Sequence, residues 1–167
     1  NGTVDFTYTV NDGSGSATAT STANLELTVT PVNDAPELVD QTASVASAFT
    51  EDAGAITVNP TVTVTDADSA DFDTGTLTVT ITTGGTSDDR LIIENIGPSA
   101  GQISVSGSTL LGALSNVSYE GTQIGTFTGG TGTTDLVVTL NAVADDVAAQ
   151  ALMRATQYDN VSDTPST

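Results

Sequence analysis

The stretch Val4-Asp5-Phe6-Thr7-Tyr8-Thr9-Val10 alternates apolar and polar side chains. This alternation is typical of a half-buried β-strand, because successive side chains of a strand point to opposite faces. Asn11-Asp12-Gly13 follows with residues that favour a tight turn, and residues 17–30 return with Leu25 and Leu27 in the same alternation. The pattern predicts a β-hairpin.

The same alternation recurs later in the chain, at residues 62–64, 77–81 and 136–140. These segments are rich in Thr, Val and Ile, which are favoured on pleated, half-buried surfaces. Gly84-Gly85 and Gly129-Gly130 lie between such segments and favour turns. Many short strands separated by turns predict an all-β chain arranged as a β-sandwich.

One segment has a helical pattern instead. Between Ala144 and Leu152, apolar residues recur at spacings of three and four, which is the stripe of an amphipathic helix. Asp145 and Asp146 fall in the first turn and Arg154 in the last, where their charges match the helix dipole and the acidic residues can cap the helix. We therefore expect one short crossover helix, about 145–154, covering one end of the sandwich.

The charge balance restricts the partners of this chain. Its 167 residues include 21 acidic and two basic side chains, giving a formal net charge of -19. Salt or bound cations must reduce this self-repulsion, and an acidic surface argues against nucleic acid and anionic membrane as partners. No apolar run is long enough for direct membrane insertion, and without cysteine no disulfide can staple the fold. An extracellular chain of this kind would need an export signal elsewhere.

Catalysis has little support in the sequence. His, Cys and Lys are absent, so the usual general bases and nucleophiles are missing. A pair of carboxylates can hydrolyse glycosides, but aromatic residues, which line the clefts of such enzymes, make up only 4% of the chain. We expect that the protein is not an enzyme.

Four parts of the sequence together resemble a known repeat family. Residues 6–13 and 27–36 resemble the end of one cadherin-like repeat, residues 64–79 the front half of the next, and residues 151–166 its later part. Such repeats occur in giant bacterial surface proteins, including adhesins of the repeats-in-toxin type. The resemblance implies Ig-like β-sandwich modules strung into long stalks, often stiffened by calcium.

The resemblance also implies a domain organisation. Residues 1–30 match the C-terminal β-hairpin of a preceding repeat or of a neighbouring subunit's repeat, residues 31–37 a Pro-rich linker, and residues 38–167 a cadherin-like sandwich lacking its last two strands. Two interpretations follow. The chain is an excerpt of a tandem array, or separate subunits complete one another by donating the hairpin. In either case the expected partners are neighbouring identical repeats or subunits.

Acidic residues at the module junction suggest a Ca²⁺ site. Calcium prefers six to eight oxygen ligands, and an Asn-Asp pair between two prolines, a Glu-Asp pair and an Asp-X-Asp loop could supply them. The resemblance to cadherins gives matching residues the same role. The predicted ligands are Asn33, Asp34, Glu51, Asp52, Asp66, Asp68, Asp71 and Asp73. The alternative is a solvated acidic loop.

Three further carboxylates are weaker candidates for metal ligands. Asp12 lies in the hairpin turn, where an ordinary Asx-turn is the alternative. Asp88 and Asp89 follow a Gly-Gly turn and precede Arg90, so a turn with a local ion pair is the alternative there.

The sequence therefore predicts a structural repeat module of an extracellular, calcium-stiffened stalk or adhesin, secreted or on the bacterial cell surface. One alternative is a protomer of a self-assembling surface filament, completed by strand donation from residues 1–30. The other is a ligand-binding adhesin domain that recognises glycan, which would require an exposed aromatic or polar pocket. The adhesive target is not evident from the sequence.

Overall fold

The computed structural model describes residues 2–17, 19–39, 48–107 and 114–164. The chain divides into two compact units, Asn1–Asp34 and Ala35–Thr167. Each unit is described by itself. Within the described residues, no helix has the length and apolar character needed to cross a membrane.

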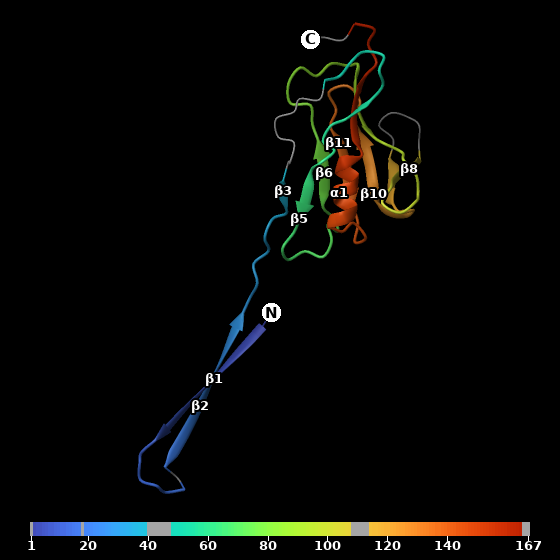
Figure 1. The fold of residues 1–167 in the computed structure, drawn as a ribbon. Helices are drawn as coiled ribbons and strands as arrows, with labels where there is room; N and C mark the ends of the chain where they lie inside the picture. The colour runs from blue at the N-terminus through green and yellow to red at the C-terminus, as the bar shows by residue number, and fades with distance from the viewer. Residues whose placement is uncertain (1, 18, 40–47, 108–113, 165–167) are drawn as a thin grey trace. The chain divides into compact units, whose positions relative to one another are not determined.

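The first unit is a β-hairpin, drawn in blue in Figure 1. Strand β1 (Gly2–Asn11) pairs antiparallel with β2 (Thr20–Val29) in unbroken register. The backbone bond from the Asp12 N–H to the Ala19 carbonyl, at 2.9 Å, closes the connection, and two side chains shape it: Asn11 Oδ1 accepts the Gly13 N–H at 2.7 Å and Asp12 Oδ1 accepts the Ser14 N–H at 2.9 Å. The hairpin predicted from the alternation at Val4–Val10 is thus present.

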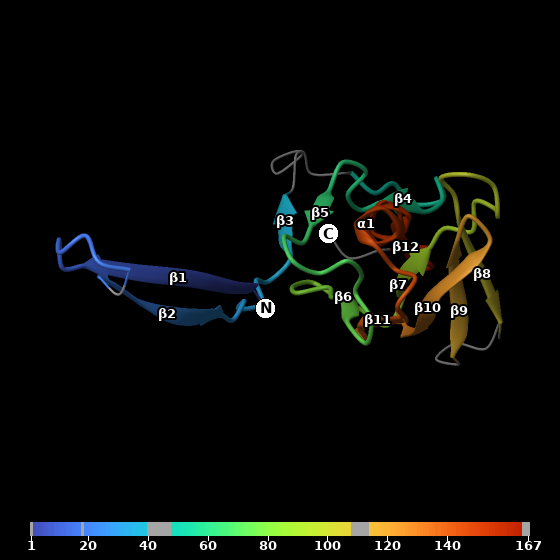
Figure 2. The ribbon, with the colours of Figure 1, turned by 90° about the horizontal axis from the view of Figure 1, so that it is seen from below.

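Within its described residues, the second unit contains one helix and the remaining strands, paired antiparallel in three sheets (Figures 1 and 2). The five-stranded sheet has the order β6-β11-β10-β9-β8, the three-stranded sheet β4-β12-β7, and the two-stranded sheet β3-β5. The bounds are β3 Glu37–Val39, β4 Ile56–Thr57, β5 Thr63–Thr65, β6 Thr76–Val79, β7 Asp89–Ile93, β8 Ile103–Gly107, β9 Ser115–Tyr119, β10 Thr122–Gly129, β11 Leu136–Leu140, α1 Asp146–Arg154 and β12 Thr156–Asn160.

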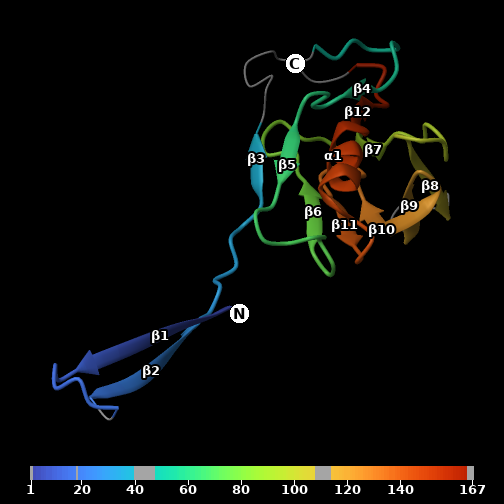
Figure 3. The ribbon, with the colours of Figure 1, turned by 60° about the horizontal axis from the view of Figure 1, so that its bottom comes forward.

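Helix α1 connects β11 to β12 and lies beside β5 (Figure 3). Asp145 is its N-cap, and its carboxylate accepts the Ala148 N–H at 2.8 Å. Arg154 occupies the last turn, where its Nε donates to the Val62 carbonyl at 2.9 Å. The predicted short helix and its capping are confirmed.

The core lies where the five-stranded sheet meets α1 and β7. Its largest fully buried side chains come from β8, β9, β10, β11 and α1 and are Ile103, Val117, Ile124, Leu136, Val138 and Leu152. A bulge at Gln123–Gly125 shifts the register of β10 against β9, and Ile124 within it is buried. An all-β sandwich with one short helix, as the sequence predicted, is the fold of this unit.

Candidate functional site

The loop between β5 and β6 carries four of the predicted calcium ligands. Asp66 Oδ1 accepts the N–H groups of Asp68 at 3.2 Å and Ser69 at 2.9 Å. These bonds lower the pKa of the Asp66 carboxyl, and the bond from Asp68 has the largest effect. Asp71 Oδ1 likewise accepts the Asp73 N–H at 3.0 Å. The carboxylates of Asp66 and Asp71 therefore hold turns of their own loop.

The other predicted ligands lie elsewhere in the fold. Glu51 and Asp52 are exposed in a turn closed by the Ala53 N–H and the Thr50 carbonyl at 3.2 Å. Asp52 lines a shallow polar hollow of about 250 Å³ together with residues 159–163. Asn33 and Asp34 belong to the first unit, where the Asn33 side-chain amide donates to the Asp34 carbonyl at 2.8 Å.

A calcium site requires these oxygens to converge on one point. In the part of the chain that the structure describes, no group of three or more acidic side chains is placed to share a metal ion. Calcium binding thus stays a prediction from the sequence.

Asp89, one of the weaker candidates for a metal ligand, is a buried residue of β7. Its side chain is 2% exposed. Oδ1 accepts the Tyr158 hydroxyl at 2.6 Å and the Asn160 amide at 2.7 Å, while Oδ2 accepts the Thr86 N–H and the Thr86 hydroxyl. Burial, the largest influence, raises the pKa of the Asp89 carboxyl, but these hydrogen bonds together outweigh it and leave the pKa below its ordinary value.

This network joins β7 to its sheet neighbour β12, so its role is structural. Arg90, the residue after Asp89, donates to the backbone carbonyls of Ser87 at 2.9 Å and Asp89 at 2.6 Å, and these bonds fix the turn that precedes β7. The buried face of β7 continues through Leu91 and Ile93. Alternate residues of a strand share a face, so Asp89 lies on the same inner face as Leu91 and Ile93. This alternation is the signal in the sequence that could have identified Asp89 as buried.

The surface that stands out chemically is one face of the hairpin. In the register Val4 pairs with Leu27 and Phe6 with Leu25, so the apolar side chains of both strands share a face. We define the apolar hairpin face as Val4, Phe6, Tyr8, Val10, Leu25, Leu27 and Val29. All seven side chains are exposed, from 43% for Phe6 to 69% for Val10.

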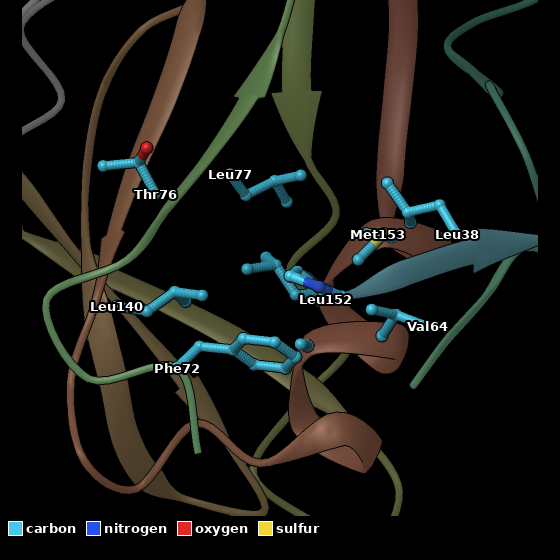
Figure 4. Close-up of a pocket in the computed structure, with 10 residues that line it drawn as sticks. Leu38, Val64, Phe72, Thr76, Leu77, Leu140, Leu152 and Met153 are labelled. Carbon is cyan, nitrogen blue, oxygen red and sulfur yellow. The ribbon is translucent and has the colours of Figure 1, made fainter. Parts of the chain in front are cut away.

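A second apolar surface lies in the second unit, between the β6 edge of the large sheet and the β3–β5 pair (Figure 4). This apolar cleft has a volume of about 110 Å³ and α1 contributes to its wall. It is lined by Pro36, Leu38, Val64, Phe72, Thr76, Leu77, Leu140, Ala149, Leu152 and Met153. Among the residues that the structure describes, no charged side chain lines it.

No protein-family model matches this chain, and neither the curated proteins nor the solved structures contain a significant match. The resemblance to cadherin-like repeats therefore stays a prediction from the residues quoted above.

Proposed function

We propose that this chain is a structural module of an extracellular stalk or filament, and that its function is to join β-modules to one another. The apolar hairpin face carries this proposal. A two-stranded hairpin is at best marginally stable in water, and an exposed apolar sheet face gains free energy when another surface covers it.

The second unit depends less on being covered by another surface. It has its own buried core, built from two sheets and a helix. A chain that combines a self-sufficient domain with a hairpin that lacks a core is suited to linking modules rather than to chemistry. The high negative charge fits this role as well, because it keeps free modules apart until specific apolar contacts form.

The location outside the cell rests on the composition and on the resemblance to cadherin-like repeats. Stiffening by calcium is a separate part of the proposal and is tested separately. Assembly through the apolar hairpin face is the part that the observed geometry supports.

Sedimentation velocity of the chain over a range of concentrations, with electron micrographs of the same samples, tests assembly. We expect the mass to rise with concentration in steps of one chain. Raised salt should strengthen association, because it screens the repulsion between acidic modules. Wild-type chain that stays monomeric at every concentration and salt level contradicts the proposal.

A matched pair of variants tests the role of the face. Phe6→Gln with Leu25→Gln, the hairpin variant, changes one cross-strand pair on the apolar hairpin face. Thr9→Gln with Thr22→Gln changes a cross-strand pair on the opposite face and serves as the control. The hairpin variant should be monomeric while the control assembles. Equal assembly of the two variants contradicts the proposal.

A further inference from the structure

We propose that the hairpin of one copy docks on a second copy, where it extends the five-stranded sheet at β6 and covers the apolar cleft with its apolar face. This inference rests on the proposed function and identifies the surface that receives the hairpin. It starts from the free edges of the sheets in the second unit.

Strand β6 forms an unprotected edge. It has the sequence Thr76-Leu77-Thr78-Val79, without charge, proline or bulge, although native proteins usually block edges with such features. The Leu140 N–H donates to the Gly75 carbonyl at 2.9 Å. Because hydrogen-bonded and non-bonded pairs alternate in antiparallel sheets, the backbone groups of Thr76 and Thr78 then face away from β11.

The edges at β8 and β7 are already covered. At β8, the Ile103 carbonyl accepts the N–H of Ile96 at 2.9 Å, and the Val105 N–H donates to the Asn95 side chain at 3.1 Å. At β7, the Leu91 N–H donates to the Gly130 carbonyl at 2.8 Å. In the described part of the chain, no backbone hydrogen bond reaches the outward groups of β6.

The free edge of β6 lies beside the apolar cleft. A two-stranded ribbon with one apolar face needs both features, an edge for its backbone and an apolar surface for its side chains. Thr76 and Leu77 of β6 line the cleft, and Figure 4 shows Leu77 pointing toward Leu38 and Val64, which come from β3 and β5. A ribbon added to β6 would pair its backbone with this edge and turn its apolar side chains toward the cleft. The cleft volume, about 110 Å³, approaches the roughly 150 Å³ of a cavity that holds a benzene-sized group.

The apolar hairpin face of a second copy suits this site as its occupant. Its exposed side chains supply more apolar surface than the cleft alone can cover, so backbone pairing at β6 must supply part of the contact. Among the described residues, neither the lining of the cleft nor the apolar hairpin face carries a charged side chain, so docking buries no charge within the apolar contact.

Variants on the receiving surface test this inference. Thr78→Pro, the edge variant, removes an outward N–H and places a ring on the free edge, while Thr78→Ala keeps the N–H as its control. The edge variant should keep its own sheet, shown by a circular dichroism spectrum equal to that of dilute, unassembled wild type, but lose assembly. Leu38→Gln provides a second probe, because Leu38 is 61% exposed and its replacement leaves the core intact. It should weaken association about tenfold.

Mixing gives the decisive result. The edge variant still has a complete hairpin, and the hairpin variant still has a complete β6 edge. Each alone should be monomeric, and their mixture should form one-to-one heterodimers and grow no further.

The outcomes separate the two proposals. Wild-type assembly by both the edge variant and the Leu38→Gln variant overturns docking at β6, yet leaves assembly through the hairpin standing. A monomeric mixture of the edge and hairpin variants also overturns docking at β6. Wild-type assembly by the hairpin variant overturns the proposed function itself.

Discussion

Replacing Asp89 by Asn tests whether the buried carboxylate holds the three-stranded sheet together. Asparagine keeps the shape of the side chain but turns one acceptor oxygen into an N–H₂ donor. Each carboxylate oxygen of Asp89 faces two donors, Tyr158 and Asn160 on one side and two groups of Thr86 on the other. Whichever side the new amide nitrogen takes, it meets two donors.

The expected cost follows from which donors can adapt. The hydroxyls of Tyr158 and Thr86 can rotate to accept, but the Thr86 N–H cannot. The Asn160 amide cannot flip without losing the bond from the Ser162 N–H to its Oδ1, at 2.9 Å. One buried donor then lacks a partner, which costs about 1–3 kcal/mol, and the remaining bonds lose their charge assistance. We expect Asp89→Asn to lower the free energy of unfolding by about 3 kcal/mol and the melting temperature by about 10 °C.

Thermal and urea melts at neutral pH measure this loss, with Asp88→Asn as the control. Asp88 is the preceding residue and its substitution removes the same charge, so it should change stability by less than about 0.5 kcal/mol. Equal stability losses in the two variants would refute the structural role of Asp89 and point to a general charge effect.

The pH dependence of the same comparison gives an independent check. The pKa of Asp89 is lowered in the folded state, so its contribution to stability is present above the ordinary carboxyl pKa, about 3.9, and is lost as pH falls through the lower folded value. The stability difference between wild type and Asp89→Asn should therefore be constant above about pH 5 and shrink below about pH 4. A difference that grows toward acid pH contradicts this assignment.

Four further predictions concern stability. Leu152→Ala, at a side chain that is 0% exposed, should cost about 3 kcal/mol in a urea melt. Gly130→Ala should cost more than Gly84→Ala in the same assay, because both glycines have positive φ but only at Gly130 would a Cβ meet a backbone carbonyl, that of Leu91. Asp145→Ala should lose about 1 kcal/mol through the missing N-cap bond. If the acidic loops bind calcium, adding it should raise the melting midpoint and a chelator should reverse the change, by about 1–2 kcal/mol per site. An unchanged midpoint removes calcium from the function.

The sequence predicted some of the strands that have an apolar inner face, such as β6 and β11, but it did not single out β8, β9 or β10, and it missed β12, whose inner face is polar. The alternation that predicted the hairpin and β11 places Val, Leu and Phe on one face. Strand β12 buries Thr156 and Asn160 instead, so it has no apolar period to detect. It is held between β4 and β7 by backbone pairing and by the bond from Asn160 to Asp89. Its strand character is set by its neighbours.

The carboxylates show the same limit on prediction. Sequence spacing indicated that Asp66 to Asp73 form a loop able to offer oxygens, but spacing does not say which N–H groups occupy those oxygens first. In the structure, Asp66 accepts two backbone N–H groups of its own loop. A short local hydrogen bond costs little entropy to form, so local capping competes with a metal site that must draw ligands from distant segments.

The alternation in the hairpin shows that one face must be covered, but it cannot name the surface that covers it. The opposite face holds the hairpin only modestly, because its Thr–Thr pairs are partly offset by Asp5, which lies directly across from Glu26, and like charges in such a pair are destabilising. The bond from the Thr7 hydroxyl to Asn24, at 3.0 Å, is exposed to water and offsets only part of this. The free energy that keeps the two strands paired must then come mainly from covering the apolar face. Hairpin formation and association are therefore coupled, and conditions that weaken one should weaken the other.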